Sequence, residues 1–228
     1  MYYDSTWLLM IPGLLLGLWA QYKVKHAYAQ YSKIGTTRGV DAQTIARQML
    51  SASGNGQVLV NGVSGQMTDH FDPRNNTVSL SEGVWGSPSI AAVGIAAHEC
   101  GHAMQAGSGY GPFKLRSAVV PVVSIGSRLY FPIFLVGMMA SWDPLITAGI
   151  ICFSLTLLFS LITLPVEFDA SRRAIVALSE GGYMTADELK GARAVLNAAA
   201  LTYVAAAISS LLQLLRLVLM SRSRSRRR

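Results

Sequence analysis

Charged side chains are scarce in this chain of 228 residues: only 14% are Asp, Glu, Lys or Arg, whereas 51% are hydrophobic, and the mean hydropathy is +0.37. Soluble domains usually carry about 25% charged residues, so the composition argues against an ordinary soluble protein. Cysteine is also scarce, because Cys100 and Cys152 are the only two, and this excludes a disulfide-rich secreted scaffold. The polar low-complexity composition typical of disordered chains is missing as well. The sequence therefore predicts a membrane protein.

Basic residues outnumber acidic residues by 19 to 12, but the excess is local. Five of the 19 lie in the last seven residues, and the rest of the chain has 14 basic and 12 acidic residues, a net charge of +2. A basic tail (221–228) that follows an apolar helix is suited to anionic lipid headgroups. We therefore expect the lipid bilayer as a partner and no binding of nucleic acid.

Four apolar stretches approach or exceed the roughly 17–25 residues that a membrane-spanning helix needs. We expect a first transmembrane helix at 1–21, a transmembrane hairpin at 117–166 and a fourth membrane-associated helix at 194–220. The first stretch is unlike a cleaved signal peptide, because its positive charges, at Lys23 and Lys25, follow the apolar residues. The sequence thus predicts a multi-pass membrane protein that is mostly α-helical.

Two polar segments, 22–116 and 167–193, separate these stretches and carry most of the remaining Lys and Arg, whereas the hairpin loop at 142–144 carries none. The positive-inside rule therefore places both segments in the cytoplasm. If the fourth apolar stretch spans the membrane completely, the basic tail lies outside and breaks this rule. Whether it spans stays open at this point.

Local patterns predict a small α+β domain within 22–116. The periodicity favours an amphipathic helix at 41–52 with Asp41 as N-cap, and a turn at 69–74. Residues 77–81 alternate like an exposed edge strand, which could pair with an extended substrate. A second helix is expected at about 90–106 with Ser87 as its cap, and TADE at 185–188 has the pattern of a capping box.

The strongest motif is His98-Glu99-Cys100-Gly101-His102 within the second of these helices. Residues four apart project from one helix face, so the two imidazoles can bind one metal ion, and Glu99 is placed to accept a proton from water. The composition predicts only about 0.0015 matches to H-E-x-x-H by chance. Cys100 points away from both histidines, so we expect it to be a small buried apolar residue.

A catalytic zinc needs a third protein ligand. Glu167 is favoured, because the membrane hairpin leaves and re-enters on the same side and so returns Glu167 to the side of the His98 helix. Asp169 and His70 stay open as alternatives, and Glu167 could instead pair with Arg172 or Arg173. Because Glu167 directly follows an apolar stretch, we expect the metal to lie close to the bilayer surface.

HECGH, a transmembrane hairpin and then EFDASRRA resemble the membrane-bound zinc metallopeptidases of the gluzincin group. HtpX-like proteases have their third ligand in an E-[FY]-x-A-D segment, in which Glu167, Phe168 and Ala170 match and Ser171 replaces Asp. The chain is similar over nearly its whole length to the bacterial neutral zinc metallopeptidases of the YugP type, including DHFDPRNNTVSLSEGVW and AAALTYVAA.

This resemblance implies a cytoplasmic zincin-like peptidase domain on about four transmembrane helices in the bacterial inner membrane. It implies Zn²⁺ held by His98, His102 and Glu167, with Glu99 as the base that activates water for attack on a peptide bond. The substrates would be peptides or membrane proteins. His70 or Tyr183 could stabilise the transition state, and Asp169 or Ser171 could orient a histidine.

Two other functions are open. A catalytically silent membrane scaffold could keep a structural metal, but it would need the ligands without the carboxylate of Glu99. A metal transporter is less favoured, because the apolar stretches contain almost no carboxylates.

Overall fold

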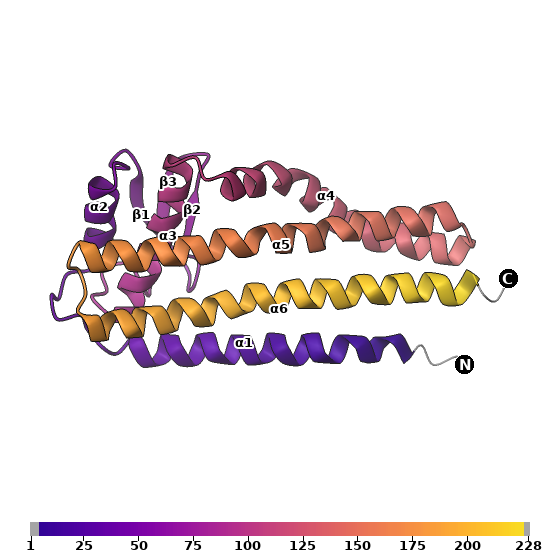
Figure 1. The fold of residues 1–228 in the computed structure, drawn as a ribbon, viewed down its shortest axis with the longest axis horizontal. Helices are drawn as coiled ribbons and strands as arrows, with labels where there is room; N and C mark the ends of the chain where they lie inside the picture. The colour runs from indigo at the N-terminus through magenta and orange to yellow at the C-terminus, as the bar shows by residue number, and fades with distance from the viewer. Residues whose placement is uncertain (1–4, 226–228) are drawn as a thin grey trace. The chain divides into compact units, whose positions relative to one another are not determined.

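The structure, a computed structural model, describes residues 5–225, so Arg226, Arg227 and Arg228 of the predicted basic tail lie outside the described residues. After a short 3-10 helix, Ser5–Leu9, the helices are α1 Met10–Tyr31, α2 Ala42–Ala52, α3 Ile90–Gly107, α4 Gly111–Ala140, α5 Asp143–Glu180 and α6 Ala186–Ser225 (Figure 1). The strands are β1 Leu59–Val63, β2 His70–Asp72 and β3 Thr77–Ser81. The protein is therefore mostly helical with one small sheet, as the sequence predicts.

Within residues 5–225, four helices are long and apolar enough to cross a membrane: Thr6–Tyr31, Gly111–Ala140, Asp143–Glu180 and Ala186–Ser223. The predicted number is confirmed, but the helices are longer than the apolar stretches. The polar segment 167–193 is helical except around residues 181–185, where α5 ends and α6 begins. Hydropathy marks where a helix becomes apolar, whereas a helix ends only where its backbone hydrogen bonds end.

The chain divides into two compact units, each built from segments that are distant in the sequence. One unit contains the segment that ends at Ala20, residues 115–164 and the segment from Thr202. Its apolar cluster contains Phe134, Ile146, Phe153 and Leu217. The second unit, 21–114 with 165–201, contains α2, α3, the sheet and the larger apolar core.

The sheet has the order β1-β3-β2, with β3 parallel to β1 and antiparallel to β2. The prediction of an edge strand at 77–81 is therefore wrong, because β3 is central and four of its five residues are buried. The predicted turn at 69–74 is also partly wrong, since His70–Asp72 forms strand β2. Asp69 binds the far end of β3: its carboxylate accepts hydrogen bonds from Ser81 N (2.7 Å) and Ser81 Oγ (2.8 Å). Residues 77–81 thus have no free edge for a substrate.

Side-chain caps begin the helices of the second unit. Asp41 caps α2 as predicted, accepting a hydrogen bond from Thr44 N at 2.8 Å. The predicted cap of α3 is corrected from Ser87 to Ser89, whose side chain accepts a hydrogen bond from Ala92 N at 3.2 Å. The capping box at the start of α6 is confirmed by reciprocal hydrogen bonds between residues 185 and 188.

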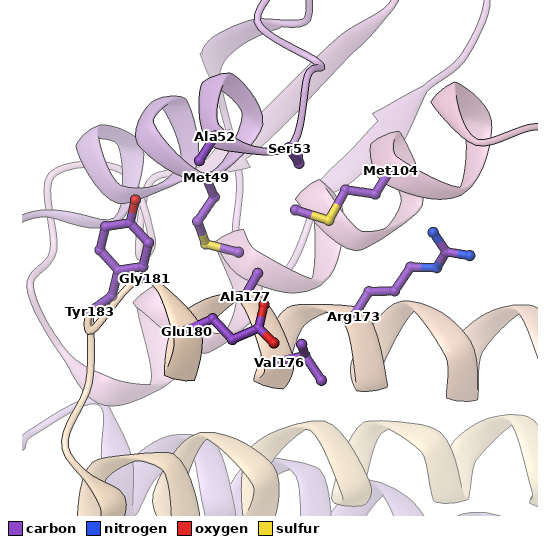
Figure 2. Close-up of a pocket in the computed structure, with 10 residues that line it drawn as sticks. All are labelled: Met49, Ala52, Ser53, Met104, Arg173, Val176, Ala177, Glu180, Gly181 and Tyr183. Atoms are coloured by element: carbon purple, nitrogen blue, oxygen red, sulfur yellow. The ribbon is translucent and has the colours of Figure 1, made fainter.

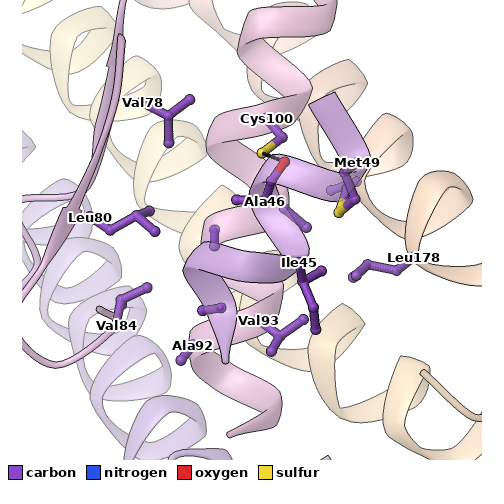
Figure 3. Packing of buried hydrophobic residues seen from close by; sticks show 14 of the residues in the cluster. Ile45, Ala46, Met49, Val78, Leu80, Val84, Ala92, Val93, Cys100 and Leu178 are labelled. Atoms are coloured by element: carbon purple, nitrogen blue, oxygen red, sulfur yellow. Dashed lines mark hydrogen bonds between the residues drawn. The ribbon is translucent and has the colours of Figure 1, made fainter. Parts of the chain in front are cut away.

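The core of the second unit forms where α2 packs on one face of α3 (Figure 3). Ile45 and Met49 of α2 are buried there with Val93 of α3. Cys100 is also buried, its Sγ donates to the carbonyl of Ala46 at 3.7 Å, and burial raises the pKa of the thiol. The prediction that Cys100 is a small buried apolar residue is confirmed. This packing leaves the opposite face of α3 for the histidines.

A glycine allows the other face of α3 to approach α5 closely. A Cβ atom added at Gly101 would lie 2.4 Å from the carbonyl oxygen of Ala170, which is backbone and cannot rotate away. About two helical turns earlier, a Cβ at Gly94 would lie 3.3 Å from the side chain of Ala192 on α6. Glycine lowers helix propensity, and these contacts give the reason why Gly94 and Gly101 occur within α3.

We predict that Gly101→Ala lowers the free energy of unfolding of the purified protein by about 1–3 kcal/mol, because the added methyl group must push α3 and α5 apart. Thermal unfolding in detergent micelles measures the effect. Gly17→Ala is the matched control, since it is also a helical glycine and a Cβ there has no neighbour within 4 Å. Equal stability of the two variants would contradict the close approach.

Candidate metal centre

Three potential metal ligands converge in the second unit. His98 and His102 of α3 and Glu167 of α5 offer one ligand atom each, and these atoms lie within 4.8 Å of one another. Glu167 Oε2 is 3.3 Å from His98 Nε2 and 3.6 Å from His102 Nε2. The glutamate side chain is only 3% exposed. The sequence predicted this set of three residues, and the structure brings them together.

The local structure explains this convergence. The two histidines are one helical turn apart on α3, and their ring centroids are 4.8 Å apart at an interplanar angle of 81°. Glu167 reaches them because Gly101 lets the backbone of α5 pass close to α3. The alternative interpretation, in which Glu167 pairs with Arg172 or Arg173, is wrong: both arginines bind Asp169.

Glu99 is buried next to this cluster, with 8% of its surface exposed. Burial raises the pKa of Glu99 to about 7; the charge of His98 opposes this rise, and the nearby carboxylates of Glu167 and Asp69 add to it. A buried carboxyl group whose pKa lies near neutrality can both accept and release a proton at physiological pH.

Each histidine contacts a polar side chain through its other ring nitrogen. His98 Nδ1 is 3.1 Å from Ser171 Oγ of α5, and His102 Nδ1 is 3.1 Å from Gln105 Oε1. Sequence reasoning named Ser171 but missed Gln105. The available signal was its spacing, because a residue three after His102 shares the histidine face of the helix.

Asp169 lies behind His102 rather than in the cluster. Its carboxylate accepts hydrogen bonds from Gln105 Nε2 (2.9 Å) and Arg173 Nε (2.6 Å), and it also binds Arg172. Asp169 therefore contacts Gln105, and it is not one of the three converging ligands.

The two residues proposed as transition-state stabilisers lie in different places. His70 is exposed on strand β2, its Nδ1 is 2.7 Å from the carbonyl of Thr68, and it is near enough to Glu99 to interact electrostatically. Tyr183 lines a cavity of about 410 Å³ between α2, α3 and α5 (Figure 2). The residues that line this cavity include none of His98, Glu99, His102 and Glu167.

Comparison with known proteins adds independent evidence about the chain as a whole. A family model described as "Putative neutral zinc metallopeptidase" matches residues 6–222. The chain belongs to this family. It is also 45% identical over 211 residues to the "Putative membrane protease YugP" of Bacillus subtilis (strain 168), covering 92% of this chain and 94% of that protein. No solved structure matches.

Membership of this family makes zinc the implied cofactor, and the donors present fit zinc. Two imidazole nitrogens and one carboxylate oxygen form a set that catalytic zinc sites use, with a position left for water. The four long apolar helices and the membrane relative make the chain a multi-pass membrane protein. The resemblance to the YugP type is thereby confirmed, whereas the more distant likeness to HtpX-like proteases stays a prediction.

Proposed function

We propose that the protein is an integral-membrane zinc endopeptidase in which His98, His102 and Glu167 hold the metal and Glu99 is the general base. The observation that supports this most directly is the convergence of the three ligand atoms within 4.8 Å, with Glu99 buried beside them. The family and the membrane relative support peptidase activity independently. In this proposal the small α+β unit is a zincin-like catalytic domain.

Zinc in this site supplies Lewis acidity, polarising a carbonyl group and lowering the pKa of water. Glu99 accepts the proton that the attacking water loses and passes it to the amine of the departing peptide. His98 and His102 are held by Ser171 and Gln105 with their Nε2 atoms toward Glu167. This fixed arrangement means that little reorganisation is needed as the peptide bond breaks.

Glu99 distinguishes this proposal from a silent metal-binding scaffold. Burying a carboxyl group costs free energy, and a structural metal site, which needs only the ligands, gives no reason for a buried carboxyl group at position 99. A metal transporter is less favoured, because His98 and His102 lie on α3, which is not among the four candidate membrane spans.

We predict that Glu99→Gln reduces proteolysis of casein or a quenched peptide by at least about 100-fold while zinc stays bound, because a general base contributes about 10²–10⁴-fold. His98→Ala and Glu167→Ala should lose both zinc and activity. Metal content and proteolysis are measured on the same purified samples. Normal turnover by Glu99→Gln would overturn the peptidase proposal.

A second prediction concerns topology. The Lys and Arg distribution places the catalytic unit in the cytoplasm in this proposal. Single cysteines are introduced as Ser53→Cys and Trp142→Cys, at two exposed positions, in a chain that carries Cys152→Ser. A membrane-impermeant maleimide should label Trp142→Cys in spheroplasts and Ser53→Cys only after permeabilisation. The reverse pattern would place the catalytic unit outside.

The third prediction concerns the substrate. Along α5, Glu167 directly follows the apolar stretch that ends at Val166, so the proposed ligand lies within about one or two helical turns, roughly 5–11 Å, of the hydrocarbon boundary. Substrates are then juxtamembrane segments or peptides at the interface. A single-span substrate with its cleavage segment next to the membrane should be cut faster than one with the same segment about 20 residues further away. Equal rates for both would contradict this placement.

A further inference from the structure

Gln105 of α3, for which the sequence predicted no role, makes three directed polar contacts around the metal centre. The side chain is fully buried. Its Oε1 lies 3.1 Å from His102 Nδ1, and its Nε2 donates to the carbonyl of Val166 (2.7 Å) and to Asp169 Oδ2 (2.9 Å). One amide thus contacts both helices that carry the predicted ligands.

These contacts determine the orientation of the amide. The carbonyl of Val166 can only accept a hydrogen bond, and the carboxylate of Asp169, which binds Arg172 and Arg173, is an acceptor as well. Only the NH₂ group of Gln105 can satisfy both. The oxygen Oε1 must therefore face His102.

The orientation of the amide in turn determines the tautomer of His102. Since Oε1 of Gln105 can only accept, the proton of the neutral imidazole must be on Nδ1. The lone pair of His102 is then on Nε2, the atom that lies 3.6 Å from Glu167 Oε2. His98 is less constrained, because its partner Ser171 has a hydroxyl group that can donate or accept.

The same amide also fixes α5 around the third ligand. Val166 immediately precedes Glu167 and Asp169 follows it by two residues, so Gln105 binds α5 on both sides of the glutamate. Arg173 Nε donates to the same oxygen of Asp169, Oδ2, at 2.6 Å. Replacing Gln105 would remove the hydrogen bond that fixes the tautomer of His102. It would also remove the hydrogen bonds that hold α5 on both sides of Glu167.

We propose that Gln105 is a positioning residue of the metal centre, which imposes the Nε2-binding tautomer of His102 and anchors α5 beside Glu167. This inference rests on the proposed metal site. It assigns to Gln105 no contact with the substrate and no part in proton transfer.

The test measures zinc affinity, by competition with a chelator, on the full-length protein in detergent micelles. Gln105→Met keeps a similar length and removes all three polar contacts, and we expect zinc binding to weaken about 10–100-fold, as when other partners of metal-binding histidines are lost. Gln48→Met, at an exposed glutamine of α2, is the matched control and should bind zinc like the wild type. Thermal unfolding of the metal-free proteins shows whether each variant is folded.

A rescue variant separates positioning from packing. Gln105→Glu combined with Asp169→Asn restores an acceptor for His102 Nδ1 and a donor–acceptor pair with position 169, but not the hydrogen bond to the carbonyl of Val166, because a carboxylate has no proton to donate. We expect this double variant to bind zinc at least about fivefold more tightly than Gln105→Met, a gain that falls within the affinity range of such contacts. If Gln105→Met does not fold, the double variant alone tests the role of Gln105. We then expect its zinc affinity to lie within about tenfold of the wild-type value.

Two outcomes would overturn the inference: wild-type zinc affinity in folded Gln105→Met, or a folded double variant whose affinity is reduced 100-fold or more. His98→Ala is measured in parallel to separate this from the proposed function. If His98→Ala keeps its zinc, the proposed metal site itself is wrong. If it loses zinc while Gln105→Met does not, only the role of Gln105 is wrong.

Discussion

The close approach of α3 and α5 at Gly101 is the constraint on which the site depends. Two helices normally pack about 8–10 Å apart, at a distance that their side chains set. Here a Cβ atom at position 101 would collide with the carbonyl of Ala170, so only glycine allows this spacing. Glu167 reaches both histidines, and Gln105 reaches the backbone of Val166, only because the helices lie this close.

One face of α3 packs in the apolar core, and the opposite face carries the candidate metal ligands. One face carries Cys100 into an apolar core with α2, where the thiol is a small buried group. The opposite face carries His98 and His102, and every polar atom placed there must find a partner, because burial makes an unsatisfied polar group expensive. Ser171 and Gln105 meet that requirement for the two histidines. The hydrogen bonds that satisfy the imidazoles are therefore the same ones that orient them.

Sequence reasoning predicted the parts of this structure that local spacing controls. The four-residue interval of the histidines, the cap at Asp41 and the number of long apolar helices all follow from helix periodicity or composition. The central position of β3 could not be predicted, because strand order depends on which neighbours pair and not on alternation within one strand. Gln105 was missed for a similar reason: its importance comes from Val166 and Asp169, which lie more than 60 residues away.

The buried carboxyl groups of this unit differ in the positive charge that lies next to them, and this difference bears on metal binding. Two arginines form ion pairs with Asp169, whereas Glu167 lies next to two imidazoles. Glu99 is buried beside the cluster of His98, His102 and Glu167. Buried charges are strongly destabilising unless an opposite charge lies close to them. In the proposed site, a divalent cation held by His98, His102 and Glu167 would bring positive charge next to the buried carboxyl groups. Under the proposed function, the burial of these carboxyl groups is therefore most favourable with the metal bound, and metal binding is coupled to the stability of this part of the fold.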